Sequence, residues 1–207
     1  MDKAPKRLIW LAVFTFAVSP LFSWASVLAT DETAVFASLS RMIWYSGSAF
    51  RIYIAMLVLF VPMLVSFFLA HGMIGLSKAK TLVLRISMIV SCLVLYVGAM
   101  WVMPSDGRTL TNENIWHGVM SFGGMLMIFL TYCLYTALTF REDKEGAGLL
   151  SGLLVFSLIT GLFAVLNVFD DKSYVIASAV SELYVLAMMG LIGYMTYYLA
   201  YRKRKIP

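Results

Sequence analysis

Long apolar runs alternate with short polar segments along the whole chain of 207 residues. A helix that crosses the hydrocarbon core of a bilayer needs about 20 predominantly apolar residues. Six runs reach that length, and each is bounded by charged or turn-forming residues: 8–30, 52–74, 82–103, 116–140, 148–169 and 174–200. The pattern predicts an all-α, polytopic membrane protein, with residues 1–207 forming a single integral domain built as a six-transmembrane-helix bundle.

The composition supports this prediction and excludes several other classes of protein. Hydrophobic residues make up 61% of the chain and charged residues only 13%, with a mean hydropathy of +0.87, whereas about a quarter of a soluble domain is charged. The net charge is +5. No basic patch is interleaved with aromatic residues, so we expect no nucleic-acid partner.

The distribution of Lys and Arg predicts the orientation, because cytoplasmic loops carry the excess of these residues. With the N-terminus inside, only four basic residues fall in outer segments, namely Arg41, Arg51, Arg108 and Lys172. The other twelve fall in inner segments: Lys3, Lys6, Arg7, Lys78, Lys80, Arg85, Arg141, Lys144, Arg202, Lys203, Arg204 and Lys205. We therefore expect both termini to be cytoplasmic and the protein to reside in the plasma membrane.

The first external segment, residues 31–51, is not plainly polar. Its apolar residues recur at near-helical spacing, at Val35, Phe36, Leu39, Ile43 and Trp44. This spacing predicts a short helix that lies at the outer interface with its apolar face toward the lipid.

Ionisable and strongly polar groups at membrane depth are costly, so each is a candidate for function. Glu182 lies eight residues into the last run, roughly 12 Å along the helix axis, and Ser178 lies one turn before it. His117 opens the fourth run with Ser121 one turn later, and Asn167 lies near the outer end of the fifth. Consecutive helices with short connections are usually neighbours. We expect these five residues to bind a ligand in a polar cavity that is open to the outer leaflet.

A structural interpretation competes with this one. Small and polar residues recur along one face of the fourth run, at Ser121, Gly124, Thr131 and Tyr135, and of the fifth run, at Ser157, Thr160, Gly161 and Ala164. Such stripes commonly mark a packing seam between helices. Glu182 could equally be a buried carboxyl group that is hydrogen-bonded to a neighbouring helix.

Neither a metal site nor a cofactor site is expected. Cys92 and Cys133 lie inside apolar runs without Cys-x-x-Cys spacing. His71 and His117 fall at opposite membrane faces, about 30 Å apart, so they cannot ligate one haem. His71 is interpreted as a residue of the cytoplasmic interface. Motifs of nucleophilic hydrolases and phosphate-binding loops are also absent from the sequence, and whether the protein is an enzyme stays open.

Two stretches resemble a known family. A short outer turn at Trp101–Asp106 precedes a helix that begins around Ile115 and contains His117, and the last run carries Ser181-Glu182-Leu183-Tyr184 ahead of aromatic-rich sequence. In these features the chain resembles the six-span DRAM/FRAG/SFK-like membrane proteins and their bacterial and archaeal relatives. The shared histidine and acidic residue of that family correspond to His117 and Glu182. The chain departs from the family at Leu183, where an aromatic residue is common, and at Phe122-Gly123, where a doubled phenylalanine is expected.

The family is linked with membrane-lipid organisation, lipid-anchor remodelling and autophagy. The resemblance therefore implies that the chain binds or organises a membrane lipid or a lipid-like amphiphile. Two alternatives remain: a small transporter or membrane-embedded substrate-binding subunit of an importer, which would take a small-molecule ligand, and a lipid- or acyl-modifying enzyme with His117 as base and Glu182 orienting it. A protein partner or a homo-oligomer is compatible with each function.

Overall fold

The computed structural model describes residues 3–18, 21, 61, 63–100, 112–169 and 177–205, and these are helical apart from short connections such as residues 72–77 and 140–143. Helix α1 (Ala4–Val13) continues into a π-helical turn, η1 (Phe14–Val18), and residues 63–71 form a further helical segment. The remaining helices are α5 (Lys78–Met100), α6 (Asn112–Thr139), α7 (Lys144–Phe169) and α8 (Ala177–Lys205). No strand occurs within these ranges, so the all-α prediction is confirmed for them.

Three helices are long and apolar enough to cross a membrane: Lys78–Gly98 in α5, Ile115–Thr139 in α6 and Lys144–Phe163 in α7. Helices α5, α6 and α7 begin at residues 78, 112 and 144, ahead of the apolar runs that begin at 82, 116 and 148. The apolar pattern marks the part of a helix that lies in hydrocarbon, whereas backbone hydrogen bonding continues into the polar interface. The predicted interfacial helix in residues 31–51 falls outside the described residues.

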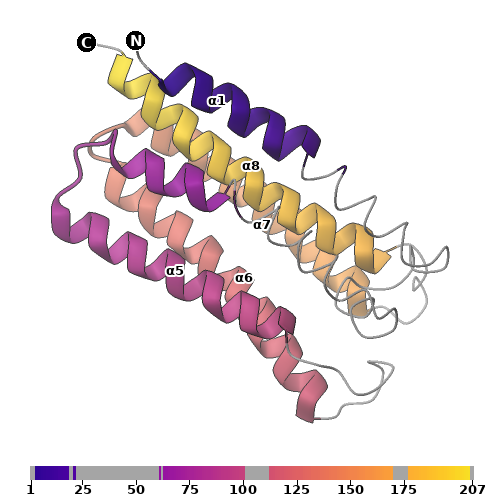
Figure 1. The fold of residues 1–207 in the computed structure, drawn as a ribbon. Helices are drawn as coiled ribbons and strands as arrows, with labels where there is room; N and C mark the ends of the chain where they lie inside the picture. The colour runs from indigo at the N-terminus through magenta and orange to yellow at the C-terminus, as the bar shows by residue number, and fades with distance from the viewer. Residues whose placement is uncertain are drawn as a thin grey trace.

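The helices lie roughly along one bundle axis, and both termini lie at the same end (Figure 1). This end also holds the starts of α1, α5 and α7 and the end of α8. We call it the basic end, because its segments contain the following residues: Lys3, Lys6, Arg7, Lys78, Lys80, Arg85, Arg141, Lys144, Arg202, Lys203 and Arg204. The bundle therefore collects basic residues that are far apart in the sequence.

Helices α5 and α6 pack closely because two glycines allow their backbones to approach. A Cβ atom at Gly98 of α5 would lie 2.5 Å from the backbone nitrogen of Ser121. A Cβ atom at Gly124 of α6 would lie 2.5 Å from the Cα of Leu95. Further along the same contact, the hydroxyl oxygens of Ser91 and Thr131 lie 3.4 Å apart.

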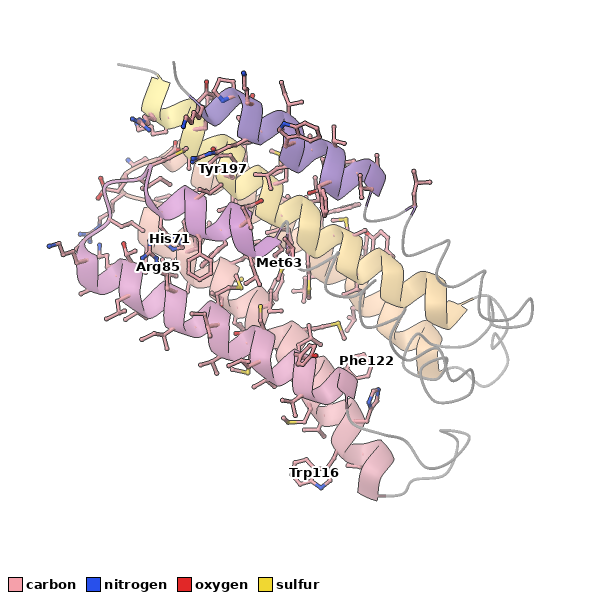
Figure 2. The ribbon with its side chains drawn as sticks, in the orientation of Figure 1. Met63, His71, Arg85, Trp116, Phe122 and Tyr197 are labelled. Carbon is pink, nitrogen blue, oxygen red and sulfur yellow. The ribbon has the colours of Figure 1, made fainter. Side chains whose placement is uncertain are left out.

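An aromatic cluster centred on Phe67 fills the bundle interior toward the basic end. The Phe67 ring lies 4.5 Å from the His71 ring, 5.3 Å from Tyr132 and 5.7 Å from Tyr135, measured between centroids. His71 donates from Nδ1 to the carbonyl oxygen of Phe67 at 2.6 Å and is only 4% exposed. The His71 imidazole is thus part of the core (Figure 2), because the helical segment at 63–71 directs it into the bundle. The position of His71 near the end of the apolar run 52–74 does not reveal this burial.

Several Ser and Thr side chains in the helices donate hydrogen bonds to the backbone of their own helix. Six hydroxyl groups donate to the carbonyl oxygen one turn earlier, at distances of 2.6–2.9 Å: those of Ser91, Thr131, Thr136, Thr139, Thr160 and Thr196. Since a hydroxyl group has one hydrogen, its oxygen can still accept a second hydrogen bond.

Candidate ligand site between α6, α7 and α8

The five predicted ligand-binding residues lie on three helices. His117 and Ser121 are in the first half of α6, Asn167 is in the last turn of α7, and Ser178 and Glu182 are in the first two turns of α8. The side chains of Asn167, Ser178 and Glu182 lie outside the described residues. Their meeting with His117 in one polar cavity therefore stays a prediction.

The polar stripe on α6 serves two different contacts. Ser121, Gly124 and Thr131 face α5 in the close contact described above. Tyr135, further along the stripe, instead contacts the aromatic cluster around Phe67. The packing-seam interpretation is therefore confirmed for Gly124 and Thr131, because small residues and a hydroxyl pair mediate helix contact there. The Ser121 hydroxyl group is buried and has no hydrogen-bond partner in the described part of the chain.

A cavity lies where α6, α7 and α8 meet, beside the stretches of α6 and α7 that are long and apolar enough to cross a membrane. Its volume is about 30 Å³, and its lining comprises Ile128, Phe129, Tyr132, Ser157, Gly161, Tyr184, Val185, Met188, Met189 and Ile192. We call it the central cavity. Most of these side chains are aliphatic, aromatic or thioether groups, with hydroxyl groups at Ser157, Tyr132 and Tyr184. Such a lining suits an apolar ligand that is oriented by a few polar contacts.

Polar contact between α7 and α8 borders this cavity. The Tyr184 hydroxyl group donates to the Thr160 hydroxyl oxygen at 2.7 Å, and Thr160 donates in turn to the carbonyl oxygen of Phe156. On the α6 side, Tyr132 is fully buried, and its hydroxyl group has no hydrogen-bond partner within the described residues. A polar group left unsatisfied in an apolar interior is destabilising. The Tyr132 hydroxyl group lies beside Gly193 of α8, where a Cβ atom would be 3.0 Å from it.

Helix α7 presents an apolar face away from the other helices. Its large hydrophobic side chains are more than half exposed, namely Leu149, Val155, Phe156, Leu158, Ile159, Leu162 and Phe163. Apolar exposure on this scale is typical of a surface in contact with lipid and is unfavourable in water. The central cavity thus lies beside a helix that is suited to face the acyl chains of the bilayer.

Two features of this site were not predicted from the sequence. The sequence places Tyr184 in a family-like motif and indicates no partner for Thr160, because 24 residues separate the two. Tyr132 was not singled out, although it precedes Tyr135 by three residues and therefore shares its helix face. Within the described ranges, no three His, Cys, Asp or Glu residues are grouped closely enough to hold a metal ion.

Comparisons with known proteins identify no relative of this chain. No family model, no curated protein and no solved structure matches the chain. The resemblance to the DRAM/FRAG/SFK-like proteins therefore rests on the two stretches of sequence that carry it.

Proposed function

We propose that this chain is a six-span protein of the plasma membrane, with cytoplasmic termini, that binds a membrane lipid between α6, α7 and α8. The orientation is supported by the basic end of the bundle, since positively charged segments are retained on the cytoplasmic side. Trp116, at the start of α6, is 55% exposed and projects outward at the opposite end (Figure 2). Tryptophan is enriched at the membrane–water interface, as a residue at the outer boundary would be.

The observation that carries the lipid proposal is the central cavity beside the exposed apolar face of α7. A cavity of about 30 Å³ accommodates only one or two groups of the size of water. We therefore expect the end of one acyl chain to enter it, while the rest of the chain lies along α7. Gly161 lines the cavity, and a Cβ atom there would meet no atom within 4 Å; we propose that the acyl chain enters on this side.

The predicted polar residues suit the headgroup of the same lipid. Glu182 precedes the cavity-lining Tyr184 by two residues, and Asn167 follows Gly161 by six. At 1.5 Å per residue, both lie within about 9 Å of the cavity along their helix axes, on the side away from the basic end. A headgroup at that level and a tail in the cavity would match the direction of a lipid of the outer leaflet.

Native mass spectrometry of gently solubilised protein tests this proposal, combined with a pair of matched glycine variants. We expect the wild-type protein to retain a phospholipid-sized adduct. Gly161→Leu fills the entrance of the cavity and should reduce the retained lipid at least several-fold. Gly152→Leu adds the same side chain to the same helix, at an exposed position with no atom within 4 Å, and should retain the lipid.

A second variant tests the headgroup. Glu182→Gln removes the charge while keeping the size of the side chain, and should weaken lipid retention while preserving the fold. Absence of lipid from the wild-type protein, or equal loss in the Gly161 and Gly152 variants, would refute the proposed site. A water-soluble molecule retained in stoichiometric amount would support a substrate-binding subunit instead.

A further inference from the structure

A second cavity lies closer to the basic end, where α6 and α7 connect. It has a volume of about 10 Å³, which matches one water-sized guest. Its lining combines residues of α6, the α6–α7 loop, α7 and α8 with one residue that precedes α5: Ile74, Tyr135, Thr139, Asp143, Gly146, Ala147, Leu150, Thr196 and Leu199. We call it the loop cavity. On both α6 and α8, its nearest lining residue lies about one turn beyond the nearest lining residue of the central cavity, toward the basic end.

The polar groups of the loop cavity offer oxygen atoms and few hydrogens. Thr139 donates its hydroxyl hydrogen to the carbonyl oxygen of Tyr135 at 2.9 Å, and Thr196 donates to that of Ile192 at 2.7 Å. Both hydroxyl oxygens are left with only lone pairs to offer. Tyr135 is 2% exposed, and its hydroxyl group has no hydrogen-bond partner among the described residues.

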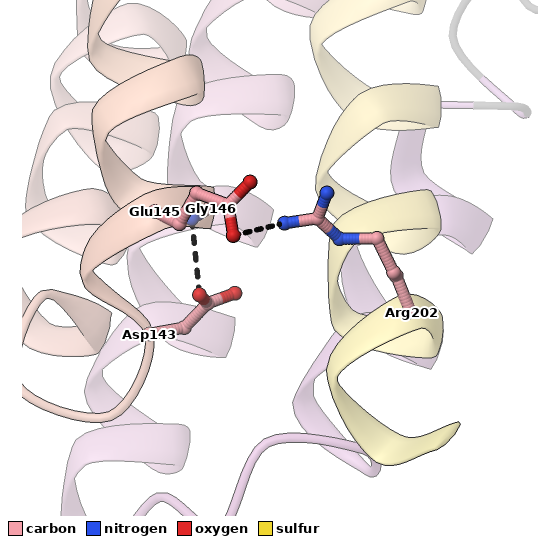
Figure 3. Close-up of polar contacts among 4 residues, drawn as sticks. All are labelled: Asp143, Glu145, Gly146 and Arg202. Atoms are coloured by element: carbon pink, nitrogen blue, oxygen red, sulfur yellow. Dashed lines mark hydrogen bonds and ion pairs between the residues drawn. The ribbon is translucent and has the colours of Figure 1, made fainter. Parts of the chain in front are cut away.

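Asp143 adds a negative charge to this set. It precedes the first residue of α7, and its Oδ1 accepts a hydrogen bond from the backbone N–H of Gly146 at 3.0 Å, as an N-cap does (Figure 3). Its Oδ2 lies directly over Gly146, where a Cβ atom would collide with it. Gly146 lines the loop cavity, so the second carboxylate oxygen lies at the cavity wall.

No basic side chain neutralises Asp143 within the described part of the chain. Arg202, the nearby arginine of α8, instead pairs with Glu145 through Nη2 and Oε2 at 3.1 Å (Figure 3). The cavity thus combines one unpaired carboxylate with three hydroxyl oxygens, two of which cannot donate.

We propose that the loop cavity binds one small monovalent cation, Na⁺ or K⁺, through Asp143, Tyr135, Thr139 and Thr196. Hard cations prefer carboxylate and hydroxyl oxygens. One carboxylate balances one positive charge, whereas Ca²⁺ sites generally use several carboxylates and six to eight ligands. The bound cation would tie α6, α7 and α8 together at the basic end. This inference does not depend on the proposed lipid site.

The thermal stability of purified wild-type protein tests the proposal. Choline chloride is replaced stepwise by NaCl or KCl at constant ionic strength, and unfolding is followed by intrinsic fluorescence. Because a ligand that binds only the folded state stabilises it, we expect the preferred cation to raise Tm by about 5 °C between 1 and 100 mM. Identical Tm values in choline, Na⁺ and K⁺ would overturn the proposal and indicate a cavity that holds water only.

Variants locate the effect within the cavity. Asp143→Asn keeps an N-cap residue but removes the charge, and Gly146→Ala displaces the carboxylate; both should abolish the cation-dependent shift in Tm. Tyr135→Phe should shift the response to at least several-fold higher cation concentration. Glu142→Gln makes the same chemical change one residue before Asp143 at an exposed position and should respond like the wild type. A full response in Asp143→Asn or Gly146→Ala would overturn the assignment.

Discussion

The hydroxyl group of Tyr184 on α8 donates to the hydroxyl oxygen of Thr160 on α7 over 2.7 Å. Between transmembrane helices, such a side-chain hydrogen bond contributes about 0.6 kcal/mol on average. Thr160 keeps its own donor bond to Phe156 when Tyr184 is removed, so no buried donor is left unsatisfied. The contact therefore links α7 to α8 with a modest energy.

We expect a double-mutant cycle of Tyr184→Phe and Thr160→Val to give a coupling energy of about 0.6 kcal/mol. The free energy of unfolding in mixed micelles is the quantity to measure. Tyr198→Phe serves as the control, because Tyr198 is also on α8 but 40% exposed, and it should change the stability by less than the Tyr184 variant does.

The glycines of the α5–α6 contact should not tolerate even a methyl group. Gly98→Ala places a Cβ atom 2.5 Å from the backbone nitrogen of Ser121, and Gly124→Ala places one equally close to Leu95. Backbone atoms cannot move aside as side chains do, so each variant should lose about 1–3 kcal/mol of unfolding free energy. Gly123→Ala, on the same helix with no atom within 4 Å, should be neutral or slightly stabilising.

The ion pair between Arg202 and Glu145 should contribute little to stability. The side chains are 32% and 74% exposed, and water screens the attraction between exposed charges. We expect Glu145→Gln to change the unfolding free energy by less than about 1 kcal/mol, and the difference to shrink in 1 M salt. A loss larger than this would show that the pair holds α7 and α8 together more strongly than its exposure indicates.

The proposed orientation predicts opposite labelling of two introduced cysteines. In a chain whose Cys92 and Cys133 are replaced by Ala, Lys144→Cys at the basic end should react only with reagents that reach the cytoplasm. Ser105→Cys, between the third and fourth apolar runs, should react with impermeant reagents added outside. Labelling of Lys144→Cys from outside intact cells would contradict cytoplasmic termini.

The hydropathy pattern predicts α5, α6 and α7 to within a few residues, because burial in hydrocarbon requires long uninterrupted apolar runs. Hydropathy gives depth in the membrane but not the direction of a side chain around its helix. The sequence alone therefore indicates an interfacial His71, although its side chain lies in the aromatic core, and it does not indicate that Asp143 lines a cavity. The sequence identifies Ser157 and Gly161 as members of a small-residue stripe. It does not show that they line a cavity, because the cavity also needs Tyr184 from another helix.

The hydroxyl groups that donate to their own helix backbone have a consequence for biosynthesis. Hydropathy scales count Thr131, Thr136 and Thr139 of α6 as polar, yet each already has its hydrogen bonded one turn earlier. In this state a threonine demands no partner from another helix, which lowers the cost of placing it in hydrocarbon. We therefore expect α6 to enter the lipid during biosynthesis more readily than its hydropathy alone indicates.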